Sequence, residues 1–291
     1  MFKSGYIAIL GAPNVGKSTL LNALLGAKLS IVCDKPQTTR QKFLGIVHHK
    51  EGQLLFLDTP GLHQAHKRLN QLMVEEAKSA IEDADLIYYV VDPKAPTQAD
   101  WGFIQEIEAK NKNYFLLINK IDKVNKLELL PFIDAWRRKC KAKEIFLVSA
   151  LGSDGIQEII NQSLTYLPEG PAYFPEDQLT NRDMRYLASE IIREKLFHLT
   201  SDEIPYSIAV VIDEYKEEPR INRISATILV EKDSQKPIVV GKGGAVLKRV
   251  GQAAREELEK LGEKKVFLSL FVKVVKDWTK QESVLKDVGF N

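Results

Sequence analysis

Short apolar runs alternate with helix-patterned stretches along the first 170 residues of the chain. Strands are expected at residues 6–10, 43–49, 54–57, 85–92, 114–118 and 144–148. Helices are expected at residues 19–26, 69–83, 101–110, 128–141 and 154–167. Strands that alternate with helices are typical of an α/β domain, in which right-handed crossovers join mainly parallel strands. The pattern therefore predicts a mainly parallel sheet with helices packed against it.

The pattern changes after a proline-rich stretch at residues 168–175, which holds three prolines and a glycine. Such a stretch cannot continue the helix before it, and it is typical of a domain boundary. Beyond it, a helix at 181–199, strands at 206–213 and 222–231, two helical stretches and a strand at 265–276 are expected. We predict a first domain at 1–170, a linker at 171–180 and a smaller α+β domain at 181–291.

Bulk composition narrows the class of protein without identifying it. The chain has 291 residues, 44% apolar and 27% charged, which is ordinary for a soluble globular protein of two domains. No apolar run approaches the roughly 20 residues of a membrane span, and the N-terminus leads directly into the first strand, so we expect no signal peptide. Cys33 and Cys140 lack metal-like spacing and are interpreted as free thiols in a reducing cytosol. A net charge of +2 does not by itself indicate a nucleic-acid partner.

The first strand is followed by the sequence Gly11-Ala-Pro-Asn-Val-Gly16-Lys17-Ser18. This is the phosphate-binding pattern G-x-x-x-x-G-K-[ST]. The glycines allow consecutive backbone N–H groups to point at phosphate oxygens, and the following helix adds a favourable dipole. Lys17 brings a positive charge to the β- and γ-phosphates, and the Ser18 hydroxyl can bind Mg²⁺. The alternative, a chance glycine-rich turn, is disfavoured because both the spacing and the strand–loop–helix context fit.

The buried strand at 54–57 ends in the sequence Asp58-Thr-Pro-Gly61. A carboxylate at this end of a strand, beside a phosphate loop, is expected on the Mg²⁺ side of the nucleotide. The backbone N–H of Gly61 can reach a γ-phosphate, and its loop can move when that phosphate leaves.

The strand at 114–118 ends in Asn119-Lys120-Ile-Asp122, which distinguishes guanine from adenine. A carboxylate accepts two hydrogen bonds from guanine N1–H and N2–H₂. Adenine lacks these donors and would leave a buried Asp122 unsatisfied, at a cost of roughly 1–3 kcal/mol. Asn119 can reach the base edge or tie the loops together, and the stem of Lys120 can stack over the base. Ser149-Ala150 can place a backbone N–H at guanine O6.

Together these loops resemble the signature loops of the translation-factor-like GTPases. The resemblance implies that Thr39 is the switch threonine, in preference to Thr38. It also implies magnesium ligands Ser18, Thr39 and Asp58, and catalytic roles for Lys17, Thr39 and Gly61. The implied GTP-binding residues are Gly11, Ala12, Pro13, Asn14, Val15, Gly16, Lys17, Ser18, Thr19, Asp58, Thr59, Pro60, Gly61, Leu62, Asn119, Lys120, Asp122, Ser149 and Ala150.

Leu62 stands where many GTPases carry a glutamine that orients the attacking water. Leucine cannot do so, and His63 is interpreted as a surface residue. We therefore expect slow intrinsic turnover, aided by a partner or a monovalent cation. Asn14 matches the position that holds K⁺ in some GTPases with a hydrophobic residue in place of that glutamine.

The second predicted domain carries Gly241-Lys242-Gly243-Gly244 between two helical stretches. A G-x-x-G loop in this place is typical of the KH fold, a single-stranded RNA clamp that grips about four nucleotides. From residue 171 onward there are 20 basic and 20 acidic residues, yet residues 236–255 hold five basic residues and no acidic one. Lys248 and Arg249 lie in this basic stripe, which favours a defined groove. The alternatives are a second phosphate turn or a plain helix junction.

The order GTPase then KH, joined by PEGPAYFPEDQLTNR, resembles the Era family of bacterial ribosome-assembly GTPases over the whole chain. The resemblance implies single-stranded RNA near the 3′ end of 16S ribosomal RNA as partner, and a role in assembling the 30S subunit. It also implies a cytoplasmic protein with peripheral contact at the inner membrane face; a monomer is expected, since the sequence has no coiled-coil heptads. Two other readings stay open: a nucleotide-using metabolic enzyme such as a kinase, and a GTPase whose second domain docks protein. The direction of coupling between GTP and RNA stays open as well.

Overall fold

The computed structural model describes residues 1–290 except 34, 36–37, 62–67 and 201–203. Its internal contacts divide the chain into two compact units. The first consists of Met1–Ser30, Thr39–Gln64 and Met73–Asn181, and the second of Ile31–Thr38, Ala65–Leu72 and Arg182–Asn291. The short segment before Thr39 therefore groups with the C-terminal part of the chain.

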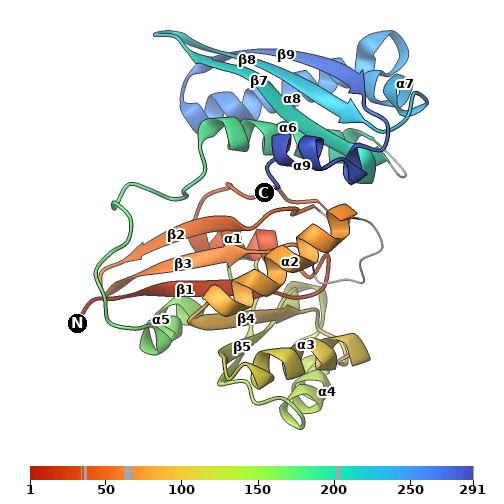
Figure 1. Cartoon of the computed structure of the whole chain (residues 1–291). Coiled ribbons are helices and arrows are strands. Elements are labelled where there is room, and N and C mark those ends of the chain that lie inside the picture. The colour runs from red at the N-terminus through yellow and green to blue at the C-terminus, as the bar shows by residue number, and fades with distance from the viewer. Residues whose placement is uncertain (34, 36–37, 62–67, 201–203, 291) are drawn as a thin grey trace. The chain divides into compact units, whose positions relative to one another are not determined.

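The first unit is built on a six-stranded sheet in the order β2-β3-β1-β4-β5-β6 (Figure 1). Its strands are β1 (Lys3–Leu10), β2 (Phe43–His49), β3 (Gly52–Asp58), β4 (Leu86–Val91), β5 (Asn113–Ile118) and β6 (Glu144–Leu147). Its helices are α1 (Lys17–Leu25), α3 (Gln98–Ala109), α4 (Lys126–Arg137), α5 (Ile156–Tyr166) and, from Met73 onward, α2 (Arg68–Asp83), with a short 3₁₀ turn at Ile121–Lys123. All neighbouring strands are parallel except β2 and β3. The predicted mainly parallel sheet is confirmed.

The central strands are unbroken apolar runs in the sequence because both of their faces are buried. All six residues of β4 and all seven of β3 are buried. Parallel strands covered by helices on both faces have no solvent side, so they need no polar alternation. The loops that follow β1, β3, β5 and β6 leave from the same edge of the sheet, where sheets of this kind bind ligands. Each of the predicted nucleotide motifs lies on one of these loops.

Residues 171–180 lie along the sheet of the first unit. The side chain of Gln53 accepts hydrogen bonds from the backbone of Tyr173 and Phe174 at 2.7 and 3.1 Å. Thr180 forms an antiparallel bridge with Gly45 of β2, and its hydroxyl donates to the Leu44 carbonyl at 2.7 Å. The stretch that follows the proline-rich sequence is therefore fixed to β2 and β3 by backbone and amide contacts.

The second unit has a three-stranded sheet in the order β7-β8-β9 (Figure 1). Its strands are β7 (Ile208–Glu217), β8 (Ile221–Val230) and β9 (Lys265–Val274). Its helices are α6 (Met184–Leu199), α7 (Gln235–Val240), α8 (Ala245–Gly262) and α9 (Glu282–Asp287), with 3₁₀ turns at Ile204–Ser207, Lys242–Gly244 and Trp278–Lys280. β7 and β8 are antiparallel, whereas β8 and β9 are parallel. The predicted α-β-β-α-α-β order is confirmed.

One face of this sheet is buried beneath α6 and α8. Along β8, Asn222, Ile224, Ala226 and Ile228 are buried, whereas the intervening residues are exposed or half-buried. Apolar residues of α6 and α8, among them Ile192 and Val250, complete this core. The alternating pattern of the sequence thus reports a strand with a single buried face.

Two sequence-based expectations about local structure are wrong. The polar composition of residues 33–42 predicts an exposed loop, but within it Arg40 and Gln41 are only 6 and 8% exposed. Strand β7 was expected to end at residue 213, but it continues to Glu217 past a register shift between Ile212 and Glu214. The added residues of β7 pair with β8 across a short hairpin, Glu214 with Ser225 and Glu217 with Asn222. In the described helices, no segment is long and apolar enough to cross a membrane.

Candidate functional site

The loop between β1 and α1 has a backbone that side chains would obstruct. Gly11 and Gly16 have φ values of 148° and 94°. A Cβ on Gly11 would lie 2.2 Å from the Val90 carbonyl oxygen, and one on Gly16 would lie 2.4 Å from the Asn119 amide nitrogen. The two glycines are therefore required by packing as well as by backbone conformation.

Lys17 begins α1 and folds back over the loop. Its ammonium group donates to the carbonyl oxygens of Gly11 and Ala12 at 3.0 and 2.9 Å, and its side chain is buried. Burial lowers the pKa of Lys17 to about 8, although the charge of Asp58 opposes this shift. The loop thus holds a buried ammonium group at the start of a helix, where anions bind favourably.

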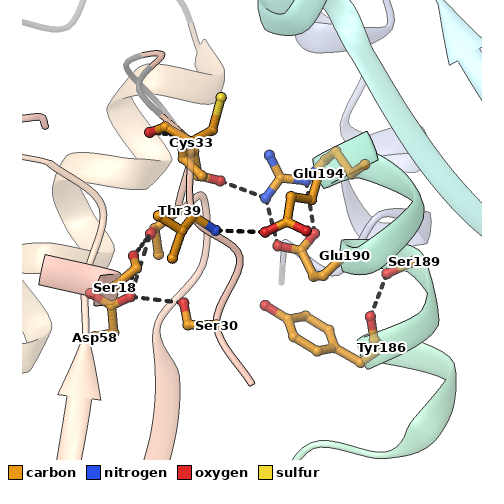
Figure 2. A network of polar contacts seen from close by, with 12 residues as sticks. Ser18, Ser30, Cys33, Thr39, Asp58, Tyr186, Ser189, Glu190 and Glu194 are labelled. Atoms are coloured by element: carbon orange, nitrogen blue, oxygen red, sulfur yellow. Dashed lines mark hydrogen bonds and ion pairs between the residues drawn. The ribbon is translucent and has the colours of Figure 1, made fainter. Parts of the chain in front are cut away.

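A partly buried cluster of oxygen atoms lies beside this lysine (Figure 2). The Ser18 hydroxyl donates to Asp58 Oδ2 at 2.7 Å, and it lies 2.8 Å from the Thr39 hydroxyl oxygen. Thr39 also approaches Asp58 Oδ2 at 3.4 Å. The structure therefore brings together the three side chains that the sequence predicted as magnesium ligands.

The chemistry of the cluster suits a hard divalent cation. Asp58 is fully buried, and its Oδ1 atom has no hydrogen-bond partner within the described part of the chain. Burial raises the pKa of Asp58, while hydrogen bonds from Ser18, Ser30 and Thr39 and the charge of Lys17 oppose the rise. A carboxylate with an unused oxygen beside two hydroxyl groups fits the oxygen-rich coordination of Mg²⁺.

Sequence reasoning missed Ser30, which also belongs to this cluster. Its hydroxyl donates to Asp58 Oδ2 at 3.1 Å, and it is buried. Asn22 of α1 fixes its backbone, accepting from the N–H groups of Leu29 and Ser30 and donating to the Ser30 carbonyl oxygen. Nothing in the local sequence marks Ser30, because its role depends on a partner 28 residues away.

Asn119 connects the base-reading loops to the phosphate loop. Its amide nitrogen donates to the Val15 carbonyl at 2.8 Å, and its oxygen accepts from the Ala150 N–H at 3.0 Å. Of the two roles left open by the sequence, the structure therefore supports the tie between loops. Of the two backbone N–H groups of Ser149-Ala150 that could reach guanine O6, the one of Ala150 donates to Asn119.

Asp122 differs from the expectation of a buried carboxylate, because it is exposed. The Ser149 hydroxyl donates to its Oδ1 atom at 2.6 Å and so fixes its orientation. Ser149 also accepts from the Gly152 N–H at 3.1 Å. Asp122 lies at the surface, because it sits in the short 3₁₀ turn beyond the end of β5 rather than in the strand.

Lys120 extends back along the phosphate loop. It has a positive φ of 64°, its ammonium group contacts the Asn14 carbonyl oxygen, and it forms a 3.0 Å ion pair with Asp92. A Cβ on Gly16 would lie 3.8 Å from its Cε atom, so the alkyl stem passes beside the loop. Asp92 was not predicted as a site residue, although its position directly after β4 could have indicated it.

Some of the remaining predicted nucleotide-site residues lie in the described part of the chain, and others lie outside it. Gly61 lies so near the phosphate loop that an added Cβ would be 2.8 Å from the Pro13 Cα atom. The buried Thr59 hydroxyl donates to the Ile9 carbonyl at 2.8 Å, so it ties β3 to β1. Thr19 follows Ser18 in α1, and Pro60 follows Thr59. Leu62 and His63 lie outside the described residues.

The second predicted site lies between α7 and α8. Gly241, Gly243 and Gly244 have φ values of 75°, 58° and 81°. A Cβ on Gly243 or Gly244 would have no atom within 4 Å, so this part of the loop faces open space. Lys242, Lys248 and Arg249 are exposed on the turn and on the first turns of α8. The loop therefore presents glycine backbone, a helix N-terminus and basic side chains together.

These arrangements define the class of protein. An Asn-Lys-x-Asp loop tied by Asn119 to a phosphate-binding loop is typical of a P-loop GTPase. The α-β-β-α-α-β unit with its open glycine loop is a KH domain. The chain thus joins a GTPase domain to a KH domain.

Comparison with known proteins identifies the family. Residues 6–120 match the family described as 50S ribosome-binding GTPase, and residues 203–279 match the KH domain family. The chain is 48% identical to GTPase Era of Syntrophus aciditrophicus (strain SB), covering 100% of this chain and 96% of that protein. It is also 48% identical to GTPase Era of Geobacter sp. (strain M21), covering 99% and 98%. The chain belongs to the Era family of GTPases.

Solved structures agree with this assignment. A crystal structure of Era in complex with MgGDPNP and nucleotides 1506–1542 of 16S ribosomal RNA has a TM-score of 0.96 and 42% identity, covering 100% of this chain and 99% of that one. A variant of Aquifex aeolicus Era bound to GDP·AlF4⁻ gives the same score and identity, covering 99% of both chains.

The buried ammonium group of Lys17 predicts a pH dependence of nucleotide binding. Because its pKa is lowered to about 8, the phosphate-binding charge is complete below that pH and is lost as the pH rises through it. We expect GTP affinity to be flat near pH 7 and to fall by up to about tenfold per pH unit above 8. Titration calorimetry from about pH 7 to about pH 9 measures this.

Lys17→Ala is the matching variant and should abolish GTP binding at every pH. A flat affinity profile in the parent protein, or retained micromolar binding in the variant, would contradict the role given to Lys17.

The second prediction concerns the choice of base. Asp122→Asn replaces one acceptor of the carboxylate with a donor, so it should shift preference from guanosine toward xanthosine nucleotides by about tenfold or more. Competition between GTP and XTP measures the ratio. Glu128→Gln, on the nearby helix α4, is the control and should leave the preference unchanged. An unaltered GTP preference in Asp122→Asn would refute base reading by this carboxylate.

Proposed function

We propose that this chain is a GTP-operated switch that binds single-stranded RNA near the 3′ end of 16S ribosomal RNA and acts in assembly of the 30S subunit. The observation that carries the proposal is the Gly243–Gly244 backbone, which faces open space between exposed basic residues. Supporting it, a relative with 42% identity and a TM-score of 0.96 was crystallised with nucleotides 1506–1542 of that RNA.

The nucleotide site acts through groups that are already positioned. Lys17 and the N-terminus of α1 attract the phosphates, and Lys17 stabilises the charge that develops when the terminal phosphate leaves. Ser18, Thr39 and Asp58 would hold Mg²⁺, which supplies further positive charge to the β- and γ-phosphates. Gly61, close against the phosphate loop, offers its N–H to the γ-phosphate. Loss of that phosphate removes an acceptor and releases the loop.

In the second unit, both open space and positive charge favour the binding of a nucleic acid. A phosphodiester can approach Gly243 closely because no side chain intervenes. Lys242, Lys248 and Arg249 neutralise phosphate charge around it. The open backbone at Gly243 therefore favours a phosphodiester over protein docking.

We also propose that the protein works as a monomer in the cytoplasm, with peripheral contact at the inner membrane face as the family resemblance implies. The cysteine chemistry supports a reducing compartment, because Cys33 and Cys140 are free thiols.

The proposal predicts that Gly243→Asp weakens RNA binding by about tenfold or more, because it places a carboxylate where a phosphate approaches. The φ of 58° also strains most side chains, so Gly243→Asn is the matched control: asparagine tolerates this conformation and adds no charge. We expect a smaller loss for Gly243→Asn and unchanged GTP hydrolysis in both. Fluorescence anisotropy with a short single-stranded RNA provides the measurement. Unchanged RNA binding in Gly243→Asp would favour the protein-docking alternative.

Potassium is proposed as a cofactor because Leu62 stands where many GTPases carry a water-orienting glutamine, and Asn14 matches the position that holds K⁺ in some GTPases with a hydrophobic residue there. Turnover should be faster in KCl than in NaCl, and Asn14→Ala should remove the difference. Asn14 has a φ of 64°, so Asn14→Gly tests loss of the amide without backbone strain and should behave alike. Phosphate release in the two salts measures the effect, and equal rates in the parent protein would exclude a role for K⁺.

A further inference from the structure

Strand β9 has two different faces, because successive side chains of a strand point in opposite directions. Val266 points toward the core formed with α6 and α8 and is buried. Phe267 and Phe271 point to the other face, where they are 51 and 60% exposed. Two large aromatic rings therefore lie largely exposed on one strand, outside the glycine loop that the proposed function uses.

Basic side chains share this outward face, the face of the β7-β8-β9 sheet turned away from α6 and α8. The outward positions of β9 are, in chain order, Lys265, Phe267, Ser269, Phe271 and Lys273. Each ring therefore has a lysine two residues away along the strand. On β8, Arg223 is in register with Phe267, and Thr227 with Phe271. Neither strand places an acidic residue on this face, and β8 separates the acidic residues of β7 from β9.

Two of these basic residues already have acidic partners, and one has none. Glu218 pairs with Arg223 at 3.0 Å, and Glu259 pairs with Lys265 at 3.2 Å. Exposed pairs of this kind contribute little to stability, so a phosphate group can replace the carboxylate. Lys273 forms no ion pair within the described part of the chain. The end of β9 that carries the second ring therefore also carries uncompensated positive charge.

The two rings are far enough apart to act as separate stacking surfaces. Four residues of strand separate Phe267 from Phe271, a distance of about 13 Å at the usual rise of a strand. Only the small side chain of Ser269 lies between them on this face. The guanidinium carbon of Arg223 lies 5.4 Å from the centroid of the Phe267 ring. Because bases stack on guanidinium planes as well as on aromatic rings, Arg223 enlarges the surface at Phe267.

We propose that the outward face of β9 is a second RNA-contact surface, on which Phe267 and Phe271 each stack one unpaired base. The rings accept any base, because every base has a flat π-face. Lys273 and Arg223 neutralise phosphate charge beside the stacked bases. This inference rests on the proposed function, because it assigns further nucleotides of the same RNA to a surface outside the glycine loop.

The surface is separate from the glycine loop, yet one RNA can reach both. The loop at 241–244 leads into α8, which packs on the buried face of the sheet. Strand β9 is at the edge of the β7-β8-β9 sheet, so an RNA strand can pass around it from one face to the other. A glycine loop of this kind grips about four nucleotides. Contact with both surfaces therefore requires a longer RNA.

The pattern of this face favours bases over a protein or a lipid partner. Ser269 separates the rings and lysines flank them, so the rings do not form one continuous apolar patch. Large continuous patches are typical of protein and membrane contact sites. Aromatic rings interleaved with cations are instead typical of proteins that bind single-stranded nucleic acid.

The test compares two lengths of one RNA, the single-stranded 3′-terminal stretch of 16S ribosomal RNA, with the full-length chain. A fragment of about four nucleotides occupies the glycine loop alone. A fragment of about sixteen nucleotides, extended on both sides of that core, can also reach β9. The double variant Phe267→Leu, Phe271→Leu keeps apolar side chains but removes both aromatic faces. The matched control is Phe267→Trp, Phe271→Trp, which keeps a ring at each exposed position.

Fluorescence anisotropy should show that the leucine double variant binds the longer RNA about tenfold or more weakly, with less than about twofold change for the shorter RNA. The tryptophan double variant should bind both RNAs as tightly as the parent protein. Unchanged binding of the longer RNA by the leucine variant, or equal losses in the two double variants, would overturn the inference. Unchanged RNA binding together with weaker binding to vesicles of anionic phospholipid would reassign the face to membrane contact.

Gly243→Asp in the same assay separates this inference from the proposed function. If that variant leaves the affinity for both RNA lengths unchanged, the proposed function fails, whatever the β9 variants do. If it weakens binding of both lengths but the leucine double variant binds the longer RNA normally, only the surface on β9 is excluded.

Discussion

The buried carboxylate of Asp58 is the constraint on which the nucleotide site depends. It is fully buried, and three hydroxyl groups from separate segments approach it: Ser18 on α1, Ser30 in the loop after that helix, and Thr39 before β2. A charge in this position is tolerated only when it is surrounded by donors or a cation. The carboxylate thereby brings the start of α1, the following loop and the switch segment to one point. The geometry of the phosphate end of the site follows from that convergence.

The two units have similar glycine loops, but the space around the glycines differs. Both place glycines before a helix N-terminus, where an anion binds favourably. In the first unit, the glycines are packed tightly, because Gly11 and Gly16 face the Val90 carbonyl and the Asn119 amide. In the second, Gly243 faces nothing within 4 Å. A closed cradle suits one small nucleotide, whereas an open loop suits a polymer that must enter from the side.

The sequence predicted those features that depend on neighbouring residues. Both sheets, the helix order and the loops around Lys17, Asp58, Asn119 and Gly243 follow from local spacing and strand–helix alternation. It could not predict Ser30 or the hydrogen bond from the Val32 N–H to Glu194, because their partners lie 28 and 162 residues away along the chain. The exposure of Asp122 was missed for a related reason: a motif specifies residue type and spacing, but not the depth at which the fold places it.

The position of Asn119 has a consequence for how nucleotide selectivity can evolve. Its side chain is buried, its amide nitrogen donates to the Val15 carbonyl, and its amide oxygen accepts from the Ala150 N–H. It therefore holds two loops together rather than contacting a base. A substitution of Asn119 that changed the base preference would also remove the hydrogen bond from Asn119 to the phosphate loop. Asp122, by contrast, is exposed, and a substitution there leaves both hydrogen bonds of Asn119 in place.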